Sequence, residues 1–152
     1  SNLAGKGAFE LCHDRVVAVC APDFFAQPPN WATICAAPRI QTVVITETWE
    51  RWAAALNLSQ PQGELHLVDA HGLGIDFALS GTGVVLTSLL IAAPYLLSQE
   101  LIMPHEGYVD ANERYFLATN PTTDNLFAKP LAEQIRQHSK KMMQTAADKF
   151  LR

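Results

Sequence analysis

The sequence predicts one α/β domain in which helices cover a largely parallel sheet. Segments with the pattern of buried strands alternate along the chain with segments of helical pattern. Each predicted strand is a short, nearly continuous apolar run, as expected for a strand covered on both faces. The chain has 152 residues, 49% of them hydrophobic and 17% charged. This composition is sufficient for one core and argues against disorder.

The first predicted elements are two strands and a helix. Residues 11–21 are rich in β-branched side chains and stop at Pro22, which favours a buried strand followed by a turn. Residues 41–45 form a second short apolar run. The helix that follows spans about residues 47–56, because a threonine precedes it as a possible cap and Trp49, Trp52, Ala53 and Leu56 share one face. We interpret the two tryptophans as core residues.

The middle of the chain continues the alternation. Residues 63–69 predict a third strand, and a short helix over residues 73–80 ends at Gly81, the usual left-handed residue after a helix. Residues 83–87 form a fourth strand. The next helix, residues 89–97, contains Pro94, which must bend or restart it.

The last predicted elements are a strand and a long helix. Residues 114–119 form the strand, which Asn120 and Pro121 close. The helix opens with Pro130 at its first position and runs to about Leu151. Its expected apolar stripe consists of Leu131, Ile135, Met142, Ala146 and Phe150.

Two glycine pairs raise the question of phosphate binding. A dinucleotide fingerprint needs three spaced glycines after a strand and before a helix. Gly81 and Gly83 follow a helix and precede a strand, which is the opposite order. Gly72 and Gly74 have the correct context, but Phe77 occupies the third glycine position. We therefore interpret both pairs as structural turns and expect no nucleotide cofactor.

Charge and cysteine content exclude further classes. The net charge of −4 and the scattered basic residues give no footprint for nucleic acid. The most apolar run, residues 84–97, is too short to span a bilayer. The three cysteines form no C-x-x-C pair, and Cys12 and His13 would point to opposite faces of a strand, so we expect buried thiols and no metal. These features together favour a cytoplasmic protein without membrane contact.

Asp69 and His71 are the strongest catalytic candidates, and the sequence offers two interpretations of them. The pair could orient each other for proton transfer. Alternatively, Asp69 caps the helix that begins near Leu73 and His71 is a polar loop residue. We favour the second interpretation over catalysis, although either residue could contact a small ligand at the end of a strand.

Four segments, in order and at this spacing, resemble the effector-binding domain of LysR-type transcriptional regulators. They are DRVVAVCAPDFF, TETWERWAAALNL, DAHGLGIDFALSGTGVVLTSLLIAAPYLLSQELIMP and RYFLATNP. The likeness covers about residues 9–135 and is greatest for the branch that includes glycine-cleavage and β-lactamase-inducer regulators. In that family the Gly81–Gly83 segment is a turn from helix to strand.

The resemblance implies a two-lobed α/β domain of the periplasmic-binding-protein type 2, with one lobe complete and the other partial. Residues 3–19 would hold the end of lobe one and the first crossover strand. Residues 20–101 would form lobe two, and residues 102–152 the return crossover and the C-terminal part of lobe one. We expect a chain truncated on its N-terminal side, in which the DNA-binding winged helix is absent and DNA contact would require that missing domain.

The resemblance also implies an effector-binding site between the lobes and no catalytic residues. Carried over to this sequence, the effector-facing residues are Thr46, Glu47, Asp69, Ala70, His71, Gly72 and Tyr115. The implied partners are a small-molecule effector and a second copy of the chain, since a bare strand edge of a partial sheet invites pairing.

Three alternatives remain open on sequence grounds. A solute-binding protein of a transporter shares the two-lobed plan, but no signal peptide opens this sequence. A small enzyme using Asp69 and His71 would lack a nucleophile or a metal set. A fragment with a purely interacting role would rely on its exposed strand edge.

Overall fold

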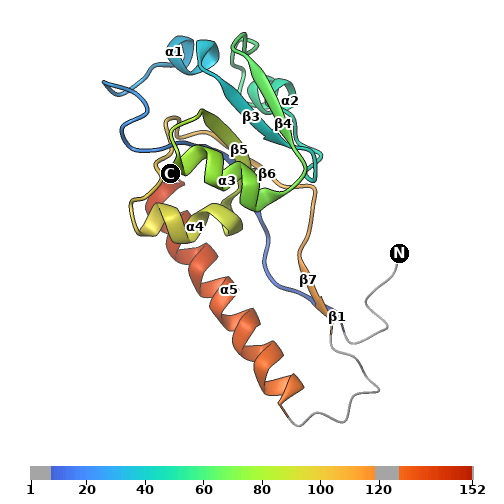
Figure 1. The fold of residues 1–152 in the computed structure, drawn as a ribbon. Helices are drawn as coiled ribbons and strands as arrows, with labels where there is room; N and C mark the ends of the chain where they lie inside the picture. The colour runs from blue at the N-terminus through green and yellow to red at the C-terminus, as the bar shows by residue number, and fades with distance from the viewer. Residues whose placement is uncertain (1–7, 119–126, 152) are drawn as a thin grey trace.

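The computed structural model describes residues 8–118 and 127–151 (Figure 1). Seven strands and five helices lie in these ranges. In chain order they are β1 (Ala8–Glu10), β2 (Arg15–Val19), α1 (Trp31–Ala36), β3 (Arg39–Thr42), α2 (Trp49–Ala55), β4 (Leu65–Val68), α3 (His71–Leu79), β5 (Val84–Ser88), α4 (Leu89–Leu97), β6 (Tyr108–Asp110), β7 (Phe116–Ala118) and α5 (Ala128–Phe150). The part of the predicted strand beyond Ala118, with Asn120 and Pro121, lies outside the described residues.

The main sheet has five strands in the order β4-β3-β5-β2-β6. Strand β3 runs parallel to β4 and to β5, whereas β2 is antiparallel to both β5 and β6. Four strands therefore share one direction and β2 alone runs against them, so the prediction of a largely parallel sheet is confirmed except for β2. The chain enters the sheet along β2 and leaves it along β6, and neighbouring entry and exit strands must run in opposite directions.

Each face of the sheet supports its own apolar cluster. Val17 and Val19 point into the cluster formed with α3, α4 and the end of α5, whereas Val16 and Ala18 point into the cluster formed with α2. Trp49 and Trp52 are fully buried in the second cluster. Their indole N–H groups donate to the carbonyls of Ile40 and Val16 at 3.0 and 3.1 Å, which confirms the interpretation of this pair as core.

A small ribbon lies apart from the main sheet. Strands β1 and β7 pair antiparallel in this ribbon, and the long helix α5 runs from its side of the molecule back to α4 (Figure 1). The C-terminal half of α5 buries Met143 and Ala146. In its N-terminal half Leu131 and Ile135 are 55% and 37% exposed. The predicted apolar stripe is thus wrong at these two positions, because this half of the helix extends beyond the main sheet.

The remaining expectations about the core can be compared directly. All three cysteines are buried and free. Helix α4 continues through Pro94, and α5 begins two residues before Pro130. In the described ranges, no group of three or more His, Cys, Asp or Glu side chains could hold a metal ion, and no helix has the length and apolarity to cross a membrane.

Candidate functional site

The predicted binding residues lie along one edge of the main sheet. At this edge β3, β4, β5 and β6 end and β2 begins, as the pairing of Val16 with Ser88 and of Arg15 with Asp110 requires. Thr46 and Glu47 lie between β3 and α2, and His71 is the first residue of α3. Tyr115 lies on the segment between β6 and β7. Carboxyl ends of parallel strands are where open α/β sheets bind small ligands.

Thr46 connects the loop after β3 to the segment after β6. Its backbone N–H donates to Oε1 of Glu113, and Asn112 donates to its side-chain hydroxyl at 3.5 Å. Burial raises the pKa of Glu113, but the hydrogen bonds that it accepts, chiefly from Thr46, and the charge of His71 together outweigh burial, so the pKa is lowered overall. Glu113 is therefore ionised at neutral pH. The sequence gives no indication of Glu113, because a glutamate in a polar loop carries no signal of its own.

Asp14 is a second residue of this edge that sequence reasoning missed. It is only 2% exposed, and its Oδ1 accepts the backbone N–H groups of Arg15 at 2.7 Å and Leu90 at 3.1 Å. The Ser88 hydroxyl donates to Oδ2 while capping α4 through the Ile91 amide. Burial raises the pKa of Asp14, and these hydrogen bonds oppose the rise. The carboxylate thus lies at the positive end of α4.

His71 opens α3, and its surroundings correct one expectation. The cap residue of α3 is Ala70, which offers no side-chain hydrogen bond, so the prediction that Asp69 caps this helix is wrong. Within the described ranges no hydrogen bond or ion pair joins Asp69 to His71. The Nδ1 atom of His71 is buried without a partner there. Burial lowers the pKa of His71, and the carboxylates of Asp14 and Glu113 oppose this effect.

Tyr115 closes the group on the side of the ribbon. Its backbone carbonyl accepts the Leu11 N–H at 2.9 Å, which fixes the segment before β7. Burial raises the pKa of its phenol, a hydrogen bond with Ser88 opposes that effect, and the charge of Asp14 adds to it. The Tyr115 side chain is therefore close to the Asp14–Ser88 pair.

The structure thus brings four of the seven predicted residues together and leaves three apart. Thr46, Glu47, His71 and Tyr115 share their surroundings with Asp14, Ser88 and Glu113. Asp69, Ala70 and Gly72 are exposed and make no side-chain hydrogen bond with this group within the described residues. We call the group of seven residues that lie together the polar edge. It offers carboxylates, hydroxyls and an imidazole for binding.

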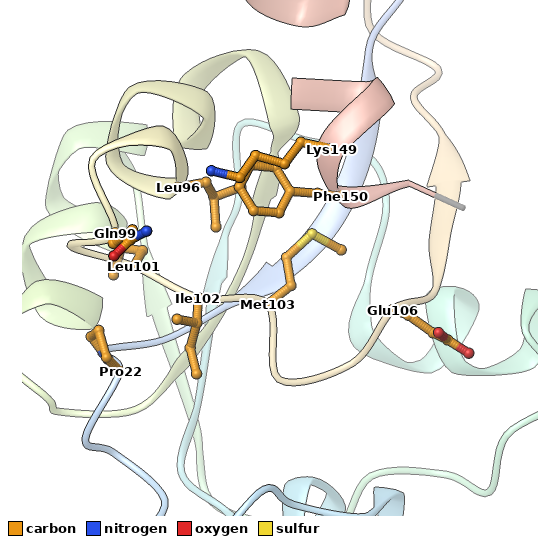
Figure 2. Close-up of a pocket in the computed structure, with 9 residues that line it drawn as sticks. All are labelled: Pro22, Leu96, Gln99, Leu101, Ile102, Met103, Glu106, Lys149 and Phe150. Atoms are coloured by element: carbon orange, nitrogen blue, oxygen red, sulfur yellow. The ribbon is translucent and has the colours of Figure 1, made fainter. Parts of the chain in front are cut away.

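A separate hollow of about 510 Å³ lies at the opposite edge of the sheet. It is lined by Pro22, Leu96, Gln99, Leu101, Ile102, Met103, Glu106, Lys149 and Phe150. Figure 2 shows the Lys149 side chain along the Phe150 ring, with Met103 beside them and Glu106 directed away. The lining is mainly apolar, and none of the predicted binding residues contributes to it.

Solved structures provide the link to known proteins. The sequence matches no protein-family model and no curated protein. The effector-binding domain of AmpR from Citrobacter freundii matches with a TM-score of 0.70 at 17% identity, over 88% of this chain and 68% of that one. The effector domain of AmpR from Pseudomonas aeruginosa gives 0.70 at 16%, over 91% and 68%.

A third match extends the same result to another member of the LysR group. The C-terminal domains of a LysR family protein from Agrobacterium tumefaciens match with a TM-score of 0.56 at 21% identity, over 97% of this chain and 69% of that one. These neighbours are regulator domains and not enzymes. The chain therefore has the mixed α/β fold of the effector-binding domains of LysR-type regulators, as its sequence predicts, and spans about two thirds of them.

Proposed function

We propose that this chain is the effector-sensing domain of a LysR-type transcriptional regulator and that its polar edge binds the effector. The observation that carries the proposal is the meeting of Thr46, His71 and Glu113 at one edge, from three separate stretches of sequence. In this proposal residues 20–101 form lobe two, and β2 and β6 are the crossovers to a partial lobe one. The regulator would act in the cytoplasm and contact DNA through a separate winged helix.

The position of Glu113 and Tyr115 suggests how binding becomes a signal. Both lie on the segment that connects β6 of the main sheet to β7 of the ribbon. A ligand that contacts Thr46 and Glu113 together binds the two sides of this connection at once. Such a ligand favours the conformation in which Thr46 and Glu113 are close together. Only the difference between its affinities for this conformation and for a more open one can act on an attached DNA-binding domain.

The test is a transcriptional reporter in which the complete regulator carries Thr46→Ala or His71→Ala. Loss of one hydrogen-bonding group should raise the effector concentration for half-maximal response about tenfold. Thr82→Ala and His66→Ala serve as matched controls, because both side chains are exposed and remote from the polar edge. An unchanged response in both site variants would remove the assignment. Ligand binding without any transcriptional response would indicate a solute-binding protein instead.

A further inference from the structure

Glu47 is a largely buried acidic residue of the polar edge. Glu47 is only 6% exposed, yet within the described residues it accepts no hydrogen bond and forms no ion pair. The charge of Arg51 lowers the pKa of Glu47, but no ion pair joins the two side chains in the described residues. A buried carboxylate normally has a charged or hydrogen-bonding partner, because desolvation without one is costly.

A buried carboxylate oxygen without a partner in the described ranges belongs to Glu113. Its Oε1 accepts the Thr46 N–H, whereas its Oε2 is buried without a partner among the described residues. Thr46 and Glu47 are adjacent, so this hydrogen bond brings Glu113 to Glu47. The charge of Glu113 raises the pKa of Glu47, which adds to the effect of burial. Two carboxylates therefore lie next to each other with unused acceptor capacity.

The groups facing this pair do not neutralise it. Burial lowers the pKa of His71 and so disfavours its charged form, and its buried Nδ1 atom also lacks a partner in the described part of the chain. Asp14 adds a further carboxylate whose charge acts on His71. Arg15, the basic residue beside Asp14, pairs with Asp110 at 3.0 Å. The acidic side chains of the polar edge thus favour a cationic ligand over an anionic one.

We propose that Glu47 and Glu113 bind a positively charged nitrogen of a small organic effector, an ammonium or a guanidinium group. Such a group supplies the N–H donors that both carboxylates lack, and charged hydrogen bonds of this kind are the stronger ones. This inference rests on the proposed function, because the positively charged group is part of the effector that binds at the polar edge.

The ligand set disfavours a metal ion as the occupant. Divalent Mg²⁺ and Ca²⁺ take six or more oxygen ligands, usually with several carboxylates or carbonyls. No group of three or more potential metal-binding side chains occurs in the described ranges. The imidazole of His71 and the Thr46 hydroxyl can instead hydrogen-bond to polar atoms on the remainder of an organic ligand.

The test follows backbone amide signals of the chain by NMR during titration with arginine and, separately, with 1,4-diaminobutane. We expect saturable shifts at residues 46–47, 71–72 and 112–113. Glu47→Gln and Glu113→Gln should each weaken the binding about tenfold. Glu64→Gln removes the same charge from an exposed position and should leave the binding unchanged. Succinate, a dianion of similar size, should cause no shift at these amides.

Each remaining outcome bears on the proposal. Absence of shifts at these amides with both organic cations would overturn it, as would equal weakening by Glu64→Gln. Shifts produced by Mg²⁺ or Zn²⁺ but by neither organic cation would also overturn it. Binding of succinate that depends on His71 and Thr46 would overturn the cation site while leaving the sensing function in place. Cation binding that depends on both glutamates, in a complete regulator that shows no transcriptional response, would support the cation site and overturn the sensing function.

Discussion

Asp14 and Glu47 are both acidic residues with little exposed surface at the same edge of the sheet, but their surroundings are opposite. Asp14 accepts two backbone N–H groups and a hydroxyl, so its charge is solvated by the protein. Glu47 has no such donor within the described residues. The first arrangement stabilises the fold, whereas the second stores a cost that a ligand can relieve.

Asp14→Ala is expected to destabilise the fold by about 2–4 kcal/mol, since it leaves the Leu90 and Arg15 amides and the Ser88 hydroxyl without their acceptor. Urea unfolding followed by circular dichroism measures this loss. Asp23→Ala removes an exposed carboxylate and should change stability by less than about 0.5 kcal/mol. Equal losses in the two variants would contradict the role of Asp14.

Glu47→Gln is expected to stabilise the unliganded chain at neutral pH. The folded-state pKa of Glu47 is raised above its ordinary value near 4.5, chiefly by burial. The ionised carboxylate therefore costs stability above the folded-state pKa, and this cost disappears as the pH falls below the unfolded value. We expect a gain of up to about 1 kcal/mol at pH 7, or roughly 2–4 °C in melting temperature.

The same comparison at about pH 4, near the unfolded pKa, should show little difference between the two proteins. Thermal unfolding at the two pH values provides the measurement. A glutamine variant that is less stable than the parent at pH 7 would show that Glu47 has a stabilising partner.

At the scale of elements, the glycine pair after α3 acts as a turn. Gly81 has a φ of 72°, which is the left-handed region, and it donates its N–H to the Ala78 carbonyl. Gly83 has no such requirement, but a Cβ there would lie 2.7 Å from the Pro38 carbonyl oxygen. The two glycines are thus required for different reasons, one conformational and one steric.

Alanine at each position should therefore cost different amounts. We expect Gly81→Ala to destabilise the fold by roughly 1 kcal/mol and Gly83→Ala by roughly 2 kcal/mol or more. Gly72→Ala is the control, since a Cβ there meets no atom within 4 Å. Chemical denaturation of the three variants tests the order. A smaller cost for Gly83 than for Gly72 would contradict the steric argument.

The helices with a strong cap and a clear apolar face could be predicted from the sequence. Helix α2 follows its Thr48 cap and buries both tryptophans, and α4 follows Ser88 and keeps Pro94. Helix α1 was missed because its six residues lie directly after Pro28, Pro29 and Asn30, a typical loop signal. Short helices of this kind depend on the cap and on tertiary contacts, which periodicity does not detect.

Strand β3 shows why a local pattern can shift a boundary. The apolar run at residues 41–45 predicts the strand there, but β3 ends at Thr42, and Val43 and Val44 are exposed. The strand begins earlier, at Arg39, whose buried guanidinium donates to the Gly63 carbonyl at 2.7 Å. A buried arginine inside a strand depends on a partner 24 residues away, and no pattern along the chain indicates it.

At the scale of the whole molecule, strand direction and the assembly of the site depend on contacts distant in sequence. The order of elements predicts the α/β class. A short apolar run, however, has the same pattern whether the neighbouring strands are parallel or antiparallel to it, so the pattern does not predict strand direction. The loop positions of Thr46, His71 and Tyr115 could be carried over from the resemblance. Asp14 and Glu113 could not, since their roles arise only where the entry and exit strands meet the ends of β3 and β5.

The ribbon and the first half of α5 leave apolar side chains without cover in the described part of the chain. Phe116, Leu131 and Ile135 are 47%, 55% and 37% exposed, and among the described residues the ribbon has two strands, β1 and β7, whose outer edges have no strand partner. Exposed apolar surface next to open strand edges favours association with a second copy. We therefore predict that the chain forms dimers at micromolar concentration.

Replacing Leu131 by Lys together with Ile135 by Gln should shift that equilibrium towards the monomer. These changes add polarity to the exposed half of α5 and do not touch the core, so the fold should remain intact by circular dichroism. Sedimentation velocity over a concentration series measures the association. The matched control, Gln134→Lys with His138→Gln, introduces the same two residue types on this half of the helix without removing apolar side chains. If the apolar double variant sediments like the parent, the surface of α5 does not mediate pairing. Association of both proteins would then point to the open strand edges of the ribbon, and a monomeric parent would contradict the predicted dimer.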